Sequence, residues 1–159
     1  MAEAIALELS LSESEIKELK IAAHLHDIGK LTLPSVIVNK PGKLNAPERF
    51  MVRQHAHIGW EMLKGFDLGH IVEDVILHHH ERFDGLGYPH RLKGNDVSIY
   101  SCIVRIADMF QALTNDRPYR PLPYTKAEAI KIINTEKDSF RPEVLEAFCA
   151  VAKCYDFIP

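Results

Sequence analysis

The chain lacks the segments that mark membrane, secreted and nucleic-acid-binding proteins. Among its 159 residues no apolar run is long enough to span a bilayer, and no signal peptide is recognisable. No basic run exceeds two residues and the formal net charge is −3 with neutral histidines, which gives no indication of binding to a nucleic-acid duplex or an anionic membrane. The three cysteines follow no C-x-x-C spacing, so reduced thiols are expected. These absences predict a cytoplasmic protein.

The sequence is also poor in the alternation of apolar and polar residues that marks β-strands, and it contains no internal repeat. Hydrophobic residues make up 47% and charged residues 26% of the chain, as in an ordinary globular domain with one core. The fold is therefore predicted to be all-α, a single helical bundle of about six to seven helices. The expected helices cover residues 2–9, 12–29, 45–64, 71–80, 98–114, 125–136 and 144–154.

Three of these helices begin with a Ser, Asn or Thr that is followed by Glu three residues later, a pattern that caps helix N-termini. The pairs are Ser12 with Glu15, Asn45 with Glu48 and Thr125 with Glu128. The first helix has no such residue. That fits a single catalytic domain, residues 1–159, excised from a longer protein and starting within a helix, although a short native N-terminal helix fits as well. Residues 31–43 are expected to be a loop, with residues 36–38 packed against the body.

Histidines are plentiful, since nine occur and most lie between His24 and His90. His78, His79 and His80 are consecutive at the point where an apolar run ends and a loop rich in Gly and Pro begins. Imidazole is the commonest protein ligand of transition metals, and helix ends beside loops can hold open metal sites. The alternative is that these histidines only cover the helix end, where positive charge is favourable.

Further candidate ligands occur in three other expected helices. His26 and Asp27 lie in the last turn of the second helix, where an Asp opposes the helix dipole and so suggests another role. His55 lies on an apolar stripe of the third helix, whereas His57 is expected to face solvent. Asp108 lies within an apolar helix, where a carboxylate is costly unless it is paired or bound to a metal.

These residues together predict a metal centre with the ligands His26, Asp27, His55, His79, His80 and Asp108. Imidazole and carboxylate without thiolate suit iron or manganese and, less well, zinc, while nickel and magnesium stay open. Six ligands are too many for one catalytic ion with open positions. Two divalent ions are therefore expected, with Asp27 as their bridge. Such a pair activates water and binds phosphoryl oxygens, which indicates phosphoester hydrolysis.

Three cations lie near these ligands in the sequence. Lys30 follows Asp27 by about one turn and is predicted to bind a phosphate oxygen or to steady a leaving oxygen. Alternatively, it only favours the dipole at a helix C-terminus. Arg117 and Arg120 follow the helix of Asp108, and paired guanidiniums suit phosphate binding. For the two arginines a solvated face is the alternative.

These motifs resemble those of the HD-GYP family, a branch of the HD-domain metal phosphohydrolases. His26-Asp27-Ile28-Gly29-Lys30 and the stretch that ends Gly87-Tyr88-Pro89 match its two name-giving motifs. Further matches are His79-His80-Glu81, Asp84-Gly85 and Ala107-Asp108. The likeness extends from about Ala4 to Phe148.

The resemblance implies a bacterial metal-dependent phosphodiesterase that hydrolyses cyclic di-GMP to the linear dinucleotide or to GMP, by attack of a metal-bridging hydroxide on phosphorus. It implies the same six metal ligands, with Asp27 and Lys30 as catalytic residues. Lys30, Arg117 and Arg120 would contact substrate phosphates. The loop Gly87-Tyr88-Pro89 would shape the substrate pocket or bind a partner such as a diguanylate cyclase. A sensory or receiver domain normally precedes this domain in the family.

Some positions depart from the family pattern. Gln111, Ser98 and Cys102 stand where the family often has Asp, Pro and Arg, and these changes can alter packing or substrate affinity. Two rival functions stay open: a general HD phosphohydrolase that acts on nucleotides or other cyclic dinucleotides, and a signalling module that binds without turnover. Product analysis across substrates separates the first from cyclic di-GMP hydrolysis, and binding without product favours the second.

Overall fold

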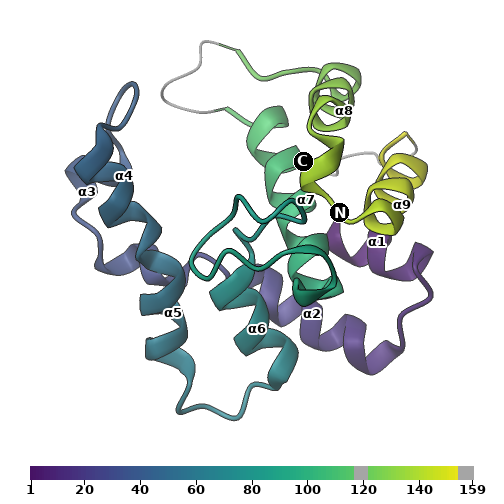
Figure 1. The fold of residues 1–159 in the computed structure, drawn as a ribbon, viewed down its shortest axis with the longest axis horizontal. Coiled ribbons are helices and arrows are strands. Elements are labelled where there is room, and N and C mark those ends of the chain that lie inside the picture. Colours follow the sequence, from purple (N-terminus) through teal and green to yellow (C-terminus); the bar gives the residue numbers. More distant parts are fainter. Residues whose placement is uncertain (117–121, 154–159) are drawn as a thin grey trace.

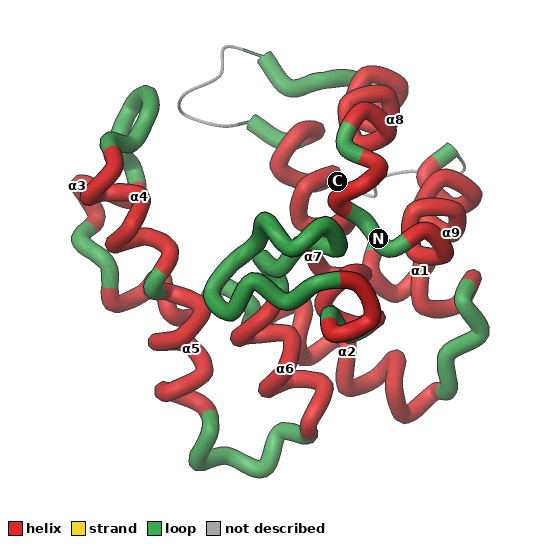
Figure 2. The backbone as a smooth tube through the Cα atoms, in the orientation of Figure 1, coloured by secondary structure: helices red, strands yellow, loops and turns green. Residues whose placement is uncertain are grey.

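The computed structural model describes residues 1–116 and 122–153, and every regular element in these ranges is helical (Figures 1 and 2). The all-α prediction is therefore confirmed. The α-helices are, in chain order, α1 (Ala2–Glu8), α2 (Glu13–Leu25), α3 (Ser35–Val38), α4 (Ala46–Arg53), α5 (His55–Leu63), α6 (His70–His78), α7 (Ile99–Thr114), α8 (Lys126–Thr135) and α9 (Pro142–Ala152). Short 3₁₀ turns cover Ile28–Thr32, Gly94–Asp96 and Lys137–Ser139.

Local capping explains where several helices begin. The three predicted pairs at Ser12, Asn45 and Thr125 all form reciprocal capping boxes, in which the side chain accepts from the amide of the Glu and the Glu accepts from the capping residue's amide. Ser98, one of the departures from the family pattern, caps α7 by accepting from the amide of Ser101 at 3.1 Å. A Pro at this position could not supply that cap.

The core lies where α2, α6 and α7 pack together, and α1, α8 and α9 cover it from the other side (Figure 1). Each helix contributes an apolar stripe, as the helical period predicts. Its largest fully buried apolar side chains are Phe110, Phe148, Ile5, Leu19, Ile71, Ile76, Ile103, Ile106 and Ile133. The core thus holds the ends of α2 and α6, where the candidate ligands lie, in fixed positions.

None of the helices in the described ranges combines the length and the apolar content that crossing a membrane requires.

The second helix is shorter than predicted. It ends at Leu25, so His26 is its C-cap and Asp27 lies beyond it, at the start of a 3₁₀ turn. The reason is the packing of Gly29, where a Cβ atom would overlap the backbone of His55 and Gly59 on α5. The chain therefore leaves the helical path so that its backbone can approach α5 closely.

The expected third helix is in fact two helices. α4 ends at Arg53 and α5 begins at His55, with Gln54 between them. His55 is buried and His57 exposed, as predicted, but Met51 and Met62, which share the expected apolar stripe with His55, are 41% and 40% exposed. The two halves therefore do not present one continuous buried face.

Residues 31–43 were expected to be a loop with residues 36–38 packed down, and this prediction is wrong in both respects. Residues 35–38 form the short helix α3, and Val36 is 76% exposed. Figure 1 shows α3 and α4 together at one side of the molecule, apart from the core helices. Arg117, Arg120 and Cys154 lie outside the described residues.

Candidate metal centre

Asp27 lies among three imidazoles that come from different elements. Its Oδ1 atom is 3.3 Å from Nε2 of His55 and 3.8 Å from Nε2 of His79, and its Oδ2 atom is 3.4 Å from Nε2 of His26. One ligand atom each of Asp27, His55, His79 and His80 lies within 4.8 Å of the others. Asp27 therefore presents its two oxygens to two different sides of the cluster.

Backbone carbonyl groups orient three of the histidines. Nδ1 of His26 lies 2.8 Å from the carbonyl oxygen of Ala23, and Nδ1 of His55 lies 2.6 Å from that of Val52. Nδ1 of His79 lies 3.0 Å from the carbonyl oxygen of Val75. A carbonyl oxygen only accepts, so each Nδ1 carries the proton and donates it, which leaves a lone pair on each Nε2 of a neutral ring. Metal-binding histidines are oriented in the same way.

The cluster as it stands has unsatisfied polar atoms, which a cation would satisfy. Nε2 of His55 and Nε2 of His79 lie 3.2 Å apart, so two lone pairs face each other when both rings are neutral. Nε2 of His26 and Oδ1 of Asp27 are buried and have no hydrogen-bond partner among the described residues. Buried acceptors without a donor are costly. The residues present thus fit one or more divalent ions.

The protonation states also fit metal binding. Burial lowers the pKa of His79 to about 3, and the neighbouring His26 and His55 add to the shift. Burial likewise lowers the pKa of His80. Burial alone would raise the pKa of Asp27, but the nearby imidazoles and Lys30 hold it well below its usual range. Neutral imidazoles and an ionised carboxylate are the states in which these groups bind metals.

His26 differs from the other imidazoles. Burial would lower its pKa, but its contacts with Asp27 raise that pKa above the ordinary value. A positive charge is therefore favoured between His26 and Asp27, and either a proton or a metal ion can supply it.

Asp108 lies at the edge of the cluster rather than inside the core. Its Oδ1 atom is 3.9 Å from Nε2 of His26, and its side chain is 31% exposed. The expectation of a buried carboxylate was therefore wrong, because Asp108 lines a cavity of about 320 Å³ that residues of α1, α2 and α7 enclose and that also reaches His26 and Gln111. Asp108 thus contacts His26, the imidazole nearest to Oδ2 of Asp27, whereas Oδ1 of Asp27 lies near His55 and His79.

Lys30 donates to Asp27 across the 3₁₀ turn. Its Nζ atom lies 2.6 Å from Oδ2 of Asp27, and both side chains are about one third exposed. Lys30 thus lies at the cluster, and its ammonium group is already paired with Asp27, the candidate bridging residue. A phosphate oxygen at the cluster would lie within reach of the same ammonium group.

Tyr88 closes the cluster on the side of the loop that follows α6. Its ring stacks on His80 with centroids 4.7 Å apart and an interplanar angle of 23°. Gly87, next to it, approaches the backbone of Glu81 and Arg82 so closely that any Cβ atom would overlap it. Position 87 therefore requires Gly, because only Gly allows the two backbone segments to approach so closely. Tyr88 supplies the ring that contacts His80, a candidate ligand.

Glu81 holds this loop, a role that the sequence analysis did not assign although the residue belongs to a recognised motif. Its side chain is buried, Oε1 accepts from the amide of His90 at 2.6 Å, and Oε2 accepts from the amide of Leu92 at 3.1 Å. The role could have been predicted from the sequence, because Glu81 stands just before a Gly-rich loop. A buried carboxylate at that position needs hydrogen-bond donors, and the loop amides supply them.

Glu81→Gln is expected to destabilise the protein by about 1–3 kcal/mol, since one of the two amides then faces an NH₂ group instead of an acceptor. Denaturant unfolding measures the loss, with Glu61→Gln on the exposed face of α5 as control. Equal stability of the two variants would show that the loop does not depend on this carboxylate.

Comparison with known proteins supports the same interpretation. A family described as "HD domain" matches residues 1–144. The chain belongs to the HD domain family. A cyclic di-GMP phosphodiesterase of Pseudomonas aeruginosa is 40% identical over 153 residues, which are 96% of this chain and 37% of the relative. A 3'3'-cGAMP-specific phosphodiesterase of Vibrio cholerae is 37% identical over 147 residues, 91% of this chain and 28% of the relative.

A solved structure with this fold is the HDG"Y"P protein Bd1817 from Bdellovibrio bacteriovorus, with a TM-score of 0.74 and 22% identity over 94% of this chain and 48% of that one. The resemblance stated from the sequence is confirmed by the family match and by the curated relatives, which are 37–40% identical to this chain. This HD domain spans less than half the length of the curated relatives named here. The His26-Asp27 pair that names the family lies at the centre of the cluster described above.

Proposed function

We propose that this HD domain is a metal-dependent phosphodiesterase that hydrolyses cyclic di-GMP to the linear dinucleotide, to GMP, or to both. The observation that carries the proposal is the convergence of three imidazole Nε2 atoms on the two oxygens of one carboxylate, at 3.3–3.8 Å. The relatives named as cyclic dinucleotide phosphodiesterases support the substrate class.

Two divalent ions, iron or manganese, are proposed to occupy the cluster. His55, His79 and His80 with Oδ1 of Asp27 would hold one ion, and His26 and Asp108 with Oδ2 of Asp27 would hold the other. The division is supported by the different histidines near the two Asp27 oxygens. When bound, such ions lower the pKa of water and neutralise the charge that develops on a phosphoryl group.

The chain's own residues would then bind and orient the substrate. Backbone carbonyls accept from Nδ1 of His26, His55 and His79 and so turn each Nε2 toward the centre. Lys30 is placed to donate to a phosphate oxygen, and its charge matters most where negative charge increases in the transition state. The loop Gly87-Tyr88-Pro89 is proposed to border the substrate, since Tyr88 already contacts His80.

Turnover tests the proposal. Protein purified without oxygen and loaded with iron or manganese is expected to convert cyclic di-GMP to the linear dinucleotide or GMP, measured by chromatography. Cyclic GMP-AMP and cyclic di-AMP in the same assay distinguish substrate choice within the class. Binding of cyclic di-GMP by the metal-loaded protein without any product would contradict the enzyme and favour the signalling module.

The location, the neighbouring domains and the partner of this domain are proposed as follows. We infer a sensory or receiver domain in the same protein, because this domain spans well under half the length of its relatives. We also infer a cytoplasmic location, which the free thiols of Cys102 and Cys149 support. The exposed part of the loop around Leu86 and Pro89 is a candidate surface for a diguanylate cyclase.

Lys30→Ala is expected to lower kcat about tenfold to hundredfold, as for loss of a charge-assisted hydrogen bond in the transition state. Metal content, measured on the same preparation, should stay at the wild-type value. Lys17→Ala, an exposed lysine of α2, is the control. Wild-type kinetics for Lys30→Ala would remove this residue from the reaction and leave it as a helix-end charge.

A further inference from the structure

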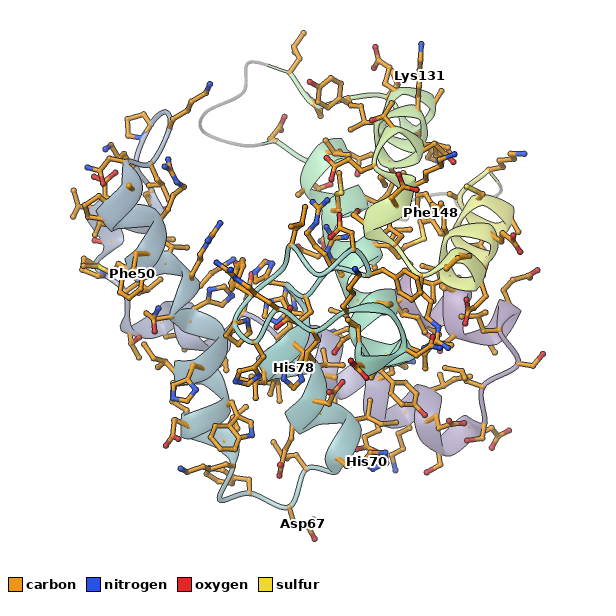
Figure 3. The ribbon with its side chains drawn as sticks, in the orientation of Figure 1. Phe50, Asp67, His70, His78, Lys131 and Phe148 are labelled. Carbon is orange, nitrogen blue, oxygen red and sulfur yellow. The ribbon has the colours of Figure 1, made fainter. Side chains whose placement is uncertain are left out.

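A groove of about 460 Å³ adjoins the candidate metal centre, between the α4–α5 pair and the loop after α6. Its lining includes Phe50 and Arg53 from α4 and Tyr88 and Arg91 from the loop. Figure 3 shows Phe50 on α4, at the side of the molecule that stands apart from the core helices. The volume lies within the range of about 300–1,000 Å³ that is usual for small-molecule sites.

Two arginines of this groove have no counter-charge. Within residues 1–116 and 122–153, neither Arg53 nor Arg91 forms an ion pair or a side-chain hydrogen bond. Arg82 and Arg141, by contrast, pair with Asp84 at 2.6 Å and with Glu143. The chain as a whole carries a net charge of −3, whereas this concave surface holds two guanidiniums that form no ion pair. Such a surface attracts anions.

The groove is connected to the metal centre through one side chain. The guanidinium of Arg53 lies over the ring of Tyr88, 4.9 Å from its centroid, and the same ring stacks on His80. A ligand in the groove is therefore separated from a candidate metal ligand by the thickness of one aromatic ring. A small molecule that bound the metal centre through a phosphate could extend into the groove.

The backbone of Arg91 supports a role for its side chain. Its φ angle is +56°, in the left-handed region that favours glycine. An arginine there is disfavoured by local backbone energy, and residues held in such conformations cluster at active and ligand-binding sites. The amide of His90, one residue earlier, is bonded to Glu81, so the buried carboxylate fixes the position of this part of the loop.

We propose that this groove is the subsite for the nucleotide of the cyclic dinucleotide that is remote from the cleaved bond, with Arg53 and Arg91 as its specificity-determining residues. The inference rests on the proposed function. Planar guanidiniums bind phosphate oxygens and the edge of guanine in a bidentate manner, and Phe50 and Tyr88 offer aromatic faces for a base. Inside the groove a small ligand fits, because the volume is that of small-molecule sites.

The test compares two substrates that differ in reach. Bis(p-nitrophenyl) phosphate, a small diester, can occupy the metal centre without filling the groove, whereas cyclic di-GMP fills both. Arg53→Ala and Arg91→Ala are each expected to raise KM for cyclic di-GMP about tenfold to hundredfold and to leave both kinetic constants for the small diester unchanged. Arg49→Ala on α4, whose guanidinium is bonded to the carbonyl group of Leu44, is the matched control and should behave as wild type.

Two outcomes would overturn the subsite: an unchanged KM for cyclic di-GMP in both variants, or an equal loss on both substrates, which would mean that the arginines act on the fold or the metal centre. Failure of the proposed function has a different signature, because the wild type would then not cleave cyclic di-GMP. In that event, calorimetry of cyclic di-GMP binding to the same three variants still tests whether the groove is a subsite. Weaker binding only in Arg53→Ala and Arg91→Ala supports the groove, and equal binding in all three variants refutes it.

Discussion

Asp27→Asn is expected to reduce cyclic di-GMP turnover by orders of magnitude while the helical content stays near that of the wild type. The two carboxylate oxygens of Asp27 face different histidines, so the residue can contact two ions at once. An amide replaces one oxygen by a group that donates hydrogen bonds and carries no charge, so one or both ions should bind more weakly. The side chain keeps its shape, and the helices that carry it are packed independently.

Three measurements check this result: turnover, metal content per chain and circular dichroism. Asp67→Asn is the matched control, since Asp67 is exposed in the connection between α5 and α6, far from the centre in Figure 3. The control should keep full activity and metal content. Asp27→Asn with wild-type turnover and a full complement of metal would show that Asp27 does not bridge.

Removal of metal is expected to lower the melting temperature by roughly 5–10 °C and to abolish turnover. A ligand at about 100 times its Kd stabilises the folded state by about 2.7 kcal/mol, and about 1 kcal/mol shifts Tm by roughly 2–4 °C at this chain length. The buried acceptors at His26 and Asp27, and the facing Nε2 atoms of His55 and His79, lose the cation that would satisfy them. Addition of iron or manganese should restore both properties.

A pair of histidines on one helix provides the control for this experiment. His55 is buried in the cluster and His57 is exposed, two residues later on α5. The melting temperature of His55→Ala should respond little to a chelator, whereas that of His57→Ala should fall as in the wild type. If the wild-type melting curve is the same before and after verified loss of metal, the cluster does not bind metal in a way that stabilises the fold.

Much of the fold could be predicted because it depends on short-range patterns. The apolar periodicity of α7 and the capping pairs at Ser12, Asn45 and Thr125 concern residues within a few positions of one another. One error occurred where distant backbone segments meet. Gly29 shortens α2 because it packs against α5, and no local pattern signals that contact.

The candidate site, like the fold, has features that were predictable from the sequence and features that depend on tertiary packing. The residue types that converge at the cluster, imidazole and carboxylate without thiolate, were predictable from the positions of His26, Asp27, His55 and the histidine triplet. The half-exposed position of Asp108, by contrast, depends on which neighbours cover α7.

The sequence by itself determined that the fold is helical, where several helices begin, and which side chains are candidate metal ligands, because capping, periodicity and ligand chemistry belong to the residues and their near neighbours. Only the tertiary structure decided that the two oxygens of Asp27 lie near different histidines, that Glu81 fixes the loop, and that Arg53 and Arg91 line one groove with Tyr88 and form no ion pair in the described part of the chain. These features depend on the packing of segments up to tens of residues apart, and the direction of a side chain is set by that packing.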